Sequence, residues 1–451
     1  MNIYEIIELC MKILSKYCLC DYCLGRQFAS IGAGIPNDEK GRILKTILYM
    51  HAHSIFKIGY IEEALKLMKC LAATGFQPAV QFLEMQKYEI PQKELCYICR
   101  GILNRDKLRE LSVKILKDLE EYEFNNFLVG ARVPTDVRER EDSIRSEYML
   151  TTGEDIKEDV TRVIGRFLVK ETGKKVEYST PDIVVIVDLN TDSYELIVNP
   201  VFIKGRYRKL VRDLPQTPWI CRNCWGRGCQ KCNFTGREYP ESISELIGNI
   251  SVEVFEALSY KFHGAGREDV DAIVLGTGRP FVLELKHPRK RNVDLKKLEE
   301  KINLEAAGKI EVSGLEYSSR RELRILKSSS PIASKTYEAI VEFERDVKEE
   351  DLASIREKFR DIIIDQWTPT RVLKRRSDKL RKKKLYYVEV ERLSEKIVKF
   401  KIKAQGGLYV KELIDGDNGR TKPNIAEAIN NKPLKIQLAV IEVENVKESS
   451  G

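Results

Sequence analysis

The sequence predicts an α+β protein. A carboxyl-terminal domain with a mixed, largely antiparallel sheet is expected to follow a smaller α/β domain and an amino-terminal helical module. Three observations support this: apolar residues recur at helical spacing through the first quarter of the chain, a few short apolar strands follow, and alternating strands separated by helices occupy the second half. A chain of 451 residues is long enough for two or three domains of about 150 residues each.

The composition fits a soluble globular protein, with 43% hydrophobic and 32% charged residues. No run of apolar residues is long enough for a transmembrane helix, which needs about 18 or more. The start of the chain, MNIYEIIELCMKIL, carries Glu5 and Glu8 and has no basic region ahead of an apolar core. That pattern argues against a signal peptide and predicts a cytoplasmic protein.

Positive charge is concentrated in two stretches. The net charge is only +8, but residues 371–384 hold nine Lys or Arg against a single acid, Asp378. A shorter basic group, at residues 286–291, lies upstream of it. Such clusters suit a phosphate-rich partner such as a nucleic acid; the alternative is a solvated helix face.

The amino-terminal third predicts a helical module that binds metal. Residues 3–17 and 39–87 have apolar positions at helical intervals. Eleven cysteines would be unusual as disulfides in a cytosolic chain, and eight of them form C-x-x-C pairs. The first two pairs, each closely followed by a glycine, are Cys20, Cys23, Cys96 and Cys99. Four thiolates complete a tetrahedral zinc site, which is favoured over a redox role. Cys10, Cys18 and Cys70 are expected to be packed thiols, although Cys18 rivals Cys20 as a ligand.

A second cysteine quartet follows a predicted linker at residues 214–219. Its two C-x-x-C pairs are separated by four residues and comprise Cys221, Cys224, Cys229 and Cys232. Gly226, Gly228 and Gly236 fit compact turns, and a stabilising zinc ion is again predicted. The alternatives are a remnant without metal, pairing with another quartet in trans, or a chaperone-like cysteine repeat. We therefore expect one or two structural zinc ions and no organic cofactor.

The middle of the chain predicts an α/β domain with one basic edge. Residues 107–122 form an amphipathic helix, and short apolar strands are expected at 127–130, 183–188 and 195–198. At residues 204–209, Lys and Arg bracket the aromatic ring of Tyr207. That mixture suits contacts to the backbone of a structured RNA.

The carboxyl-terminal half predicts a sheet with helices. A capping box at Ser242 and Glu245 opens a helix over residues 242–261. We expect a β-hairpin over residues 270–285 with its turn at 276–278, alternating strands at 334–343, 386–390 and 397–402, and a helix opened by a glycine turn over 409–413.

An acid, Asp269, lies just ahead of the expected hairpin and is approached through Gly264, Ala265 and Gly266. Small residues let another backbone come close, and an acid at a strand entrance is placed to meet a ligand. The plain alternative is that Asp269 and Asp271 are turn residues. A dinucleotide-binding loop is excluded, because no strand precedes these glycines, no helix follows and the third glycine is absent.

Three short motifs resemble the catalytic core of pseudouridine synthases: G-R-x-D at residues 266–269, K-x-Y at 335–337 and G-x-Y-x-K-x-L at 407–413. The longer segments AGREDVD and LGTGRPF, which follow each other in the chain, resemble the tenth family of these enzymes, the archaeal and eukaryotic type that modifies the T-arm of tRNA. FLVGARVP, VREREDSIR, PDIVVIVDLNTD and GRYRKLVR resemble the THUMP-type domain of that family. The motifs keep their order from Cys20 to Asn424, so the resemblance covers most of the chain.

This resemblance implies an isomerase that converts uridine to pseudouridine in the TΨC arm, at position 55 and also at 54, through an aspartate nucleophile. It implies binding of the tRNA T-arm and acceptor end, with no membrane partner. The resemblance and the cysteine spacing divide the chain into a zinc module (1–104), a THUMP-like domain (105–213), a linker with the second quartet (214–240) and a catalytic domain (241–451).

The resemblance also implies roles for individual residues. Asp269 matches the catalytic aspartate, with Asp271 as its local competitor. The expected substrate-binding residues are Tyr337 packing on the uracil, Tyr409 in the third motif, Lys411 paired with the aspartate, Leu413 lining the base pocket and Arg267 filling the gap left by a flipped nucleotide. Residues 366–376 and 416–424 are expected to contact the T-arm backbone.

Three other functions compete with this one. A different THUMP-linked enzyme would need a pyrophosphatase-type loop or a glycine-rich cofactor loop after a strand, and neither is visible in the sequence. A zinc deaminase would need H-x-E beside a C-x-x-C pair, and none of the four histidines supplies it. A non-catalytic zinc-containing RNA-binding or RNA-chaperone protein remains open, and it would tolerate the loss of Asp269.

Overall fold

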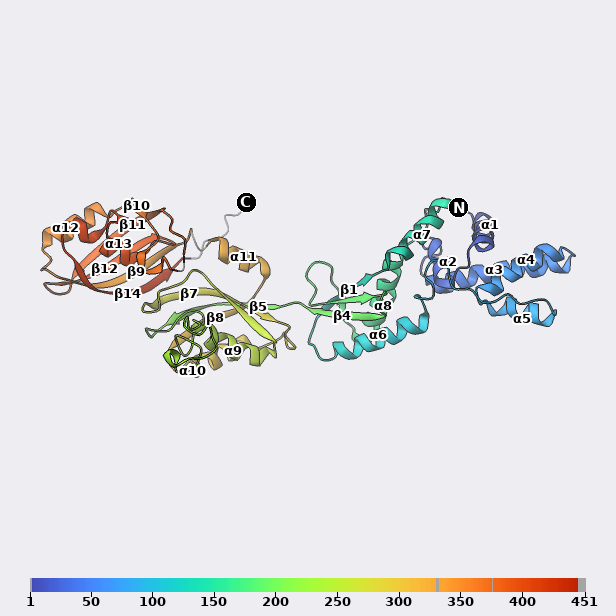
Figure 1. The fold of residues 1–451 in the computed structure, drawn as a ribbon, viewed down its shortest axis with the longest axis horizontal. Helices are drawn as coiled ribbons and strands as arrows, with labels where there is room; N and C mark the ends of the chain where they lie inside the picture. The colour runs from blue at the N-terminus through green and yellow to red at the C-terminus, as the bar shows by residue number, and fades with distance from the viewer. Residues whose placement is uncertain (1, 330–331, 375, 445–451) are drawn as a thin grey trace. The chain divides into compact units, whose positions relative to one another are not determined.

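The computed structural model describes residues 2–329, 332–374 and 376–444 (Figure 1). The chain forms two compact units, Met1–Asn199 and Pro200–Gly451, called here the amino-terminal and carboxyl-terminal units. No helix among the described residues is both long and apolar enough to cross a membrane.

The amino-terminal unit begins with five helices: α1 (Ile3–Lys16), α2 (Asp21–Gln27), α3 (Asn37–Lys57), α4 (Ile61–Ala73) and α5 (Gln77–Met85). Asn2 caps α1 through a capping box with Glu5, and buried apolar residues of α1 recur at helical spacing. The helices predicted from apolar spacing are therefore confirmed.

A four-stranded sheet with three helices completes this unit. The helices are α6 (Arg105–Leu119), α7 (Thr135–Glu147) and α8 (Ile156–Thr172). The strands are β1 (Asn126–Arg132), β2 (Lys175–Val176), β3 (Ile183–Asp188) and β4 (Ser193–Val198), in the order β2-β1-β3-β4. The central pair is parallel, and β4 is antiparallel to β3.

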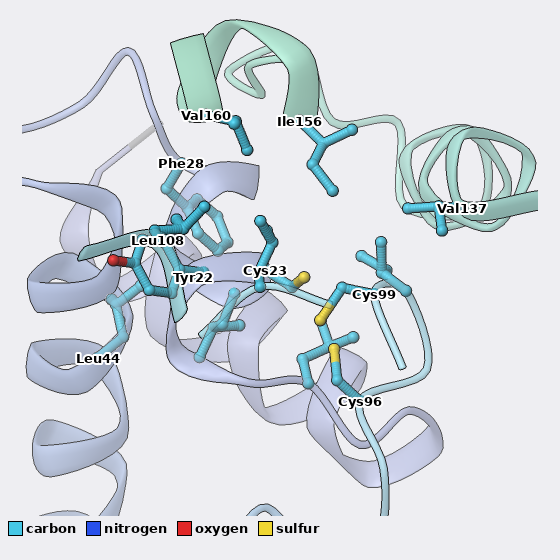
Figure 2. Packing of buried hydrophobic residues seen from close by; sticks show 14 of the residues in the cluster. Tyr22, Cys23, Phe28, Leu44, Cys96, Cys99, Leu108, Val137, Ile156 and Val160 are labelled. Atoms are coloured by element: carbon cyan, nitrogen blue, oxygen red, sulfur yellow. The ribbon is translucent and has the colours of Figure 1, made fainter. Parts of the chain in front are cut away.

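A single hydrophobic cluster runs through the whole amino-terminal unit, from Ile6 to Leu189. In Figure 2, the cysteines of the helical part lie among Val137 of α7 and the first turns of α8. The expected border at residues 104 and 105 is therefore not a break in packing, because both sides bury their apolar faces in one core.

The carboxyl-terminal unit is built on a ten-stranded sheet. Its strands are β5 (Val201–Lys209), β6 (Ser259–Gly264), β7 (Ile273–Lys286), β8 (Ile310–Ser318), β9 (Ser334–Phe343), β10 (Ile362–Gln366), β11 (Arg381–Arg392), β12 (Ile397–Gln405), β13 (Thr421–Lys422) and β14 (Pro433–Val443). Their order is β13-β10-β11-β12-β9-β14-β7-β5-β8, with β6 paired to β7. Only the β14–β7 pair is parallel, so the predicted mixed, largely antiparallel sheet is confirmed.

Six α-helices accompany this sheet in the described residues: α9 (Ile243–Phe255), α10 (Leu295–Glu305), α11 (Arg320–Ser329), α12 (Glu349–Lys358), α13 (Val410–Asp415) and α14 (Ile425–Ala428). Short 3-10 turns lie at Gln230–Cys232 and Thr370–Val372. Ser242 caps α9, because its side chain accepts a hydrogen bond from the backbone amide of Glu245, as the sequence predicts.

The expected hairpin at residues 270–285 is wrong. Residues 273–286 form one strand, β7, whose second half pairs antiparallel with β6 on one side and with β5 on the other. The register of β5 against β7 slips at Gly276 and Gly278, which have φ of +54° and +71°, so the glycines form a bulge rather than a reversal. The strand continues because β5 and β14 pair with it at Val274, on the amino-terminal side of the bulge.

Residues 201–209 form strand β5, which belongs to the second sheet and not to the sheet of the amino-terminal unit. The segment 105–213 was expected to be a THUMP-like domain, but residues 201–209 pair with β7 and β8 of the second sheet. Alternate side chains of β5, including Ile203 and Tyr207, are buried in a core shared with α9 and α10. The unit boundary therefore falls at residues 199 and 200.

Candidate active site and cysteine centres

The three motif segments meet at one cavity of about 340 Å³ in the carboxyl-terminal unit. Arg267 and Asp269 enter it from the loop between β6 and β7, Tyr337 from β9, and Tyr409 from the turn ahead of α13. The sheet brings these segments together because β14 pairs with both β7 and β9. The cavity also contains apolar side chains of β14, Leu438 and Val440.

Asp269 is held by an arginine that the sequence analysis did not assign to it. Arg371 Nη1 donates to Asp269 Oδ1 at 2.7 Å, and Arg371 Nε donates to Glu412 Oε1 at 2.5 Å. One guanidinium fork thus bridges two carboxylates, a geometry for which arginine is well suited. The Asp269 side chain keeps 30% of its surface exposed, so it remains accessible from the cavity.

Lys411 pairs with the other acid of the loop. Its Nζ lies 2.6 Å from Asp271 Oδ2, and Lys411 is not among the residues that line the cavity. Burial acts to raise the pKa of Asp271, but the hydrogen bond and charge of Lys411 outweigh it, and the net pKa is lowered. In the structure, Lys411 therefore pairs with Asp271, and Arg371, rather than Lys411, pairs with Asp269.

The loop that carries Asp269 is fixed by a buried polar group. Tyr207 Oη donates to the Glu268 carboxylate at 2.9 Å, and Arg279 Nε lies 2.8 Å from Glu268 Oε2. Gln216 Nε2 donates to Tyr207 Oη at 2.8 Å and to the Gly266 carbonyl at 2.9 Å. Glu268 and Arg279 are both almost fully buried, and each is the ion-pair partner that offsets the cost of burying the other's charge. Arg279 Nη1 also donates to the Ala265 carbonyl at 2.8 Å, whereas its Nε makes no hydrogen bond within the described residues.

Tyr207 was expected to contact RNA, but it is fully buried. Its Oη instead belongs to the group that holds Glu268, directly beside Asp269 in the chain. The basic and aromatic pattern at residues 204–209 did not reveal this, because strand alternation points Tyr207 into the core.

Lys335 places a buried amine at the cavity. The residue is only 5% exposed, it lies on the same face of β9 as Tyr337, and the described residues offer it no hydrogen-bond or ion-pair partner. Burial lowers its pKa to about 7, and the positive charges of Arg279 and Lys383 act in the same direction against Glu268. In the sequence, only the K-x-Y motif marks this lysine.

The cavity lining is strongly basic. Seven basic side chains line it against two acids, Glu268 and Asp269: Arg267, Arg279, Lys335, Arg371, Arg376, Arg381 and Lys383. Arg376 Nη1 donates to Tyr409 Oη at 3.0 Å, and the Arg371 guanidinium lies 6.0 Å from the centre of the Tyr409 ring. The site therefore combines one exposed carboxylate, two aromatic rings and an excess of positive charge.

The first cysteine quartet fits a metal ion. The sulfur atoms of Cys20, Cys23, Cys96 and Cys99 all lie within 4.8 Å of one another. A tetrahedral zinc site with Zn–S bonds of about 2.3 Å has sulfur atoms about 3.8 Å apart, and Cys20 Sγ lies 3.6 Å from Cys99 Sγ. Cys18 is outside the group, because its thiol donates to the carbonyls of Ala73 and Glu94.

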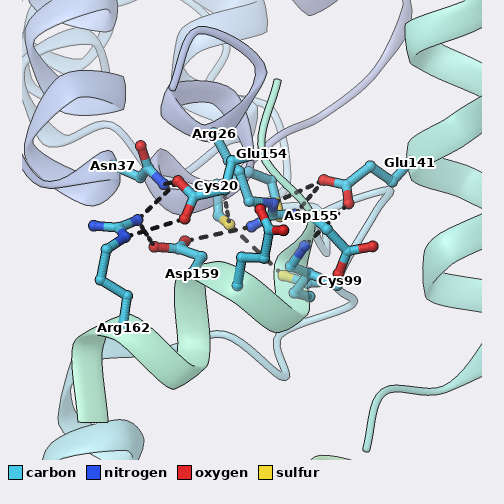
Figure 3. A network of polar contacts seen from close by, with 12 residues as sticks. Cys20, Arg26, Asn37, Cys99, Glu141, Glu154, Asp155, Asp159 and Arg162 are labelled. Atoms are coloured by element: carbon cyan, nitrogen blue, oxygen red, sulfur yellow. Dashed lines mark hydrogen bonds and ion pairs between the residues drawn. The ribbon is translucent and has the colours of Figure 1, made fainter. Parts of the chain in front are cut away.

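A buried arginine links this quartet to the rest of its unit. Arg26 is fully buried; its Nη2 donates to Cys23 Sγ at 3.5 Å and its Nε donates to Glu141 Oε1 at 2.7 Å (Figure 3). Asp159 of α8 lies 3.7 Å from Arg26 Nη1. Four thiolates around a divalent cation leave a net negative charge, so a guanidinium at this position has a compensating role.

The second quartet has the same spacing. Its sulfur atoms lie 3.9 Å apart for Cys221 and Cys229, and 3.8 Å apart for Cys224 and Cys232. The amides of Gly228 and Gly236 donate to Cys224 Sγ and Cys232 Sγ at 3.2 and 3.3 Å. A side chain at Gly236 would place its Cβ 2.4 Å from the Gly226 carbonyl oxygen, so this turn requires glycine. Both quartets can hold a metal ion.

Two family models match the chain. The Pus10 carboxyl-terminal model matches residues 202–444, and the archaeal Pus10 THUMP-domain model matches residues 111–188. The tRNA pseudouridine synthase Pus10 of Thermofilum pendens is 45% identical over 432 residues, covering 96% of this chain and 94% of that protein. The chain belongs to the Pus10 family. Membership places it among the pseudouridine synthases, which are isomerases, and the expected enzyme class is confirmed.

Further similarities cover different shares of the chain. The tRNA pseudouridine synthase Pus10 of Methanocaldococcus jannaschii is 40% identical over 440 residues, covering 96% of this chain and 94% of that protein. A chain in the crystal structure of a Cbf5-Nop10-Gar1 complex is 16% identical, with a TM-score of 0.30, over 54% of this chain and 50% of that one. A pseudouridylate synthase is also 16% identical, with a TM-score of 0.21, over 54% of this chain and 64% of that one.

Measured against the Pus10 resemblance, the cavity holds most but not all of the expected residues. Arg267, Asp269, Tyr337 and Tyr409 line it. Leu413 is fully buried in the core around α13 and is not among the residues that line the cavity. Apolar contact from this turn comes instead from Leu408 and Val410.

Replacing Lys335 with methionine should stabilise the protein more at pH 6 than at pH 9.5. Below pH 7 the amine is charged in both the folded and unfolded chains, so its burial is fully unfavourable. Between pH about 7 and the ordinary pKa of 10.5, the unfolded wild-type chain binds more protons than the folded one, so the free energy of unfolding of the wild type rises with pH. The stability that methionine adds therefore becomes smaller over this range.

Urea unfolding of the wild type and of Lys335→Met at the two pH values measures this difference. Lys435→Met, which removes an exposed lysine from β14, is the matched control and should show no such pH dependence. Equal stabilisation by Lys335→Met at both pH values would contradict the buried, shifted amine.

Proposed function

We propose that this chain converts uridine to pseudouridine in the TΨC arm of tRNA, at position 55 and also at 54, with Asp269 as the nucleophile. The main support is that the three motif segments meet at one cavity, which Asp269, partly exposed, lines together with Tyr337 and Tyr409. The names of the Pus10 relatives, tRNA pseudouridine synthases, support tRNA as the substrate.

The reaction needs few groups. The bond between C1′ and N1 breaks, the base rotates, and a bond forms between C1′ and C5; C5 loses a proton and N1 gains one. No electron leaves the substrate, so a carboxylate nucleophile and groups that hold the free base are sufficient. In this proposal, Arg371 fixes one oxygen of Asp269 and thereby orients the carboxylate toward the sugar or the base.

The rest of the cavity suits an everted nucleotide. Tyr337 and Tyr409 offer aromatic surfaces for the extruded base, which an enzyme must hold once it leaves the stack. The basic residues on the rim suit the flanking phosphates. Arg267 is proposed to occupy the space that the flipped nucleotide vacates, as the family resemblance implies.

The amino-terminal unit is proposed to bind the acceptor end of the tRNA through its THUMP domain, which the family model places at residues 111–188. Both cysteine quartets are proposed to hold structural zinc, and a cytoplasmic location is part of the same proposal. The division into a zinc module, a THUMP domain, a short linker with the second quartet and a catalytic domain is kept, with β5 assigned to the catalytic domain.

Replacing Asp269 with asparagine should lower pseudouridine formation by at least about 10³-fold, because an amide cannot act as the nucleophile. Asp271→Asn is the matched control in the same loop and should keep activity within about tenfold of the wild type, because Asp271 contacts Lys411 outside the cavity.

The measurement is carbodiimide adduct mapping on T-arm transcripts, with uridine 54 or 55 replaced by cytidine to separate the positions. RNA affinity should be nearly unchanged in both variants. Full activity of Asp269→Asn with intact RNA binding would favour the alternative, a non-catalytic RNA-binding protein.

Arg371→Lys should lower kcat by about 10- to 100-fold, because a lysine cannot bridge Asp269 and Glu412 and a small displacement of the nucleophile is costly. Lys411→Met should change kcat by less than about fivefold, because Lys411 contacts only Asp271 among the acids of this loop. Single-turnover kinetics compare the two variants. A larger loss of kcat in Lys411→Met than in Arg371→Lys would mean that Lys411, and not Arg371, is the partner of Asp269, and it would contradict the observed geometry.

The purified chain should contain two zinc ions. Cys96→Ser and Cys221→Ser should each lower the content to one ion, because each removes one of four ligands from a separate quartet. Cys70→Ser, outside both quartets, should retain two. Elemental analysis measures the content, and a wild-type value of one ion would mean that one quartet is not a zinc site.

A further inference from the structure

Two large aromatic side chains project from the second cysteine quartet into solvent. Trp225 is 77% exposed and Phe234 is 74% exposed. Each follows the second cysteine of a C-x-x-C pair within two residues, so the two pairs present one ring apiece. Exposed rings contribute little to the core of the unit, and other large hydrophobic side chains of this chain, such as Tyr178, are exposed to a similar extent. The position of these two rings on one cysteine quartet is what singles them out.

Both rings are carried on backbone that bulky residues seldom adopt. Trp225 has φ of +54° and Phe234 has φ of +60°, in the left-handed region. The turns impose this conformation: the Trp225 amide donates to the Cys221 carbonyl, and the Phe234 amide donates to the Cys229 carbonyl, both at 2.9 Å. The quartet therefore holds two exposed rings in fixed positions at some conformational cost.

The surroundings of the rings are basic. Of the four basic side chains in residues 219–239, Arg222 pairs with Glu238 at 3.1 Å and Arg237 pairs with Glu245. Arg227 and Lys231 are exposed and make no ion pair with any described residue. Uncompensated positive charge thus flanks both rings.

The same segment touches the rim of the catalytic cavity. Trp219, at its start, packs edge-on against Tyr239, at its end, with ring centres 5.4 Å apart. The guanidinium of Arg267, which lines the cavity, lies 5.2 Å from the centre of the Trp219 ring. The start of this segment therefore lies beside the rim of the cavity.

We propose that residues 219–239 form a binding surface for unpaired nucleotides of the same RNA, with Trp225 and Phe234 stacking on bases and Arg227 and Lys231 contacting phosphates. The proposal rests on the proposed function, because it takes its RNA from the neighbouring cavity. Separate rings flanked by positive charge suit nucleotide bases, since every base has a face for stacking and a phosphate beside it. Ile220, 61% exposed in the same segment, adds apolar surface, but the unpaired charges of Arg227 and Lys231 favour a partner that carries phosphates.

The test uses the full chain and a tRNA transcript. Trp225→Ala and Phe234→Ala should each raise the dissociation constant about fivefold or more, with kcat at saturating RNA within about twofold of the wild type. Leu304→Ala, which removes an 81%-exposed side chain from α10, is the control and should bind as the wild type does. Zinc content, measured for every variant, should be unchanged, because neither ring belongs to the quartet.

Two further readouts separate stacking and charge. In a Trp219→Phe, Trp367→Phe background, the fluorescence of Trp225 should be quenched by a T-arm hairpin with unpaired loop bases and not by a continuous duplex. The double variant Arg227→Ala, Lys231→Ala should reduce the slope of log affinity against log salt by about 1.4, the value for two contacts to a single strand.

Failure of this inference differs from failure of the proposed function. Wild-type affinity in both ring variants, with zinc retained and pseudouridine still formed, would overturn the surface and leave the enzyme intact. Loss of affinity in the ring variants of a chain that forms no pseudouridine would support the surface and remove the enzymatic proposal. Equal quenching by hairpin and duplex would overturn the stacking role.

Discussion

The arrangement of the site depends on one guanidinium. Arg371 bridges Asp269, in the loop ahead of β7, and Glu412, in α13, and so joins segments that are 102 and 41 residues away from it in the chain. Because its fork contacts both carboxylates, the position of the exposed acid is defined relative to the turn that carries Tyr409. The Lys411–Asp271 pair joins the same loop to α13, but Arg371 is the group that contacts Asp269 itself and so sets the direction of its carboxylate.

Arg371 can fix Asp269 because the loop that carries Asp269 is itself held in place by buried contacts. Glu268, next to Asp269, is buried and held by Tyr207 and Arg279, while Gln216 fixes the carbonyl of Gly266. A buried carboxylate with all its partners is costly to displace, because removing one partner leaves an uncompensated charge. The amino-terminal unit uses a comparable device, since buried Arg26 joins the cysteine quartet to Glu141 of α7. In each unit, a buried arginine ties a functional centre to the surrounding core.

Sequence patterns predicted the positions of helices and strands better than they predicted which strands and which charged residues pair. The helices of the first unit, the alternating strands and the two cysteine quartets follow from local periodicity and spacing, and all are found. The hairpin at β7 was wrong because a Gly-Thr-Gly segment fits a bulge as well as a turn, and only the neighbouring strands decide between them. Lys411 was assigned to Asp269 by motif resemblance, whereas the actual contact is with Asp271. Arg371 lies in a basic run, and nothing local to that run indicates its partners.

The sequence by itself determined the classes of residue and their order: two cysteine quartets, an acid ahead of a strand, and aromatic residues in alternating segments. It also determined the family, because the order of several short motifs is specific when each alone is weak. Only the tertiary structure decided which charges meet. Ion pairs such as Arg371–Asp269 join residues far apart in the chain, and their partners are set by strand order and register rather than by local spacing. The same reason explains why Tyr207 is a buried support and Trp225 an exposed ring, although both are aromatic residues among basic neighbours.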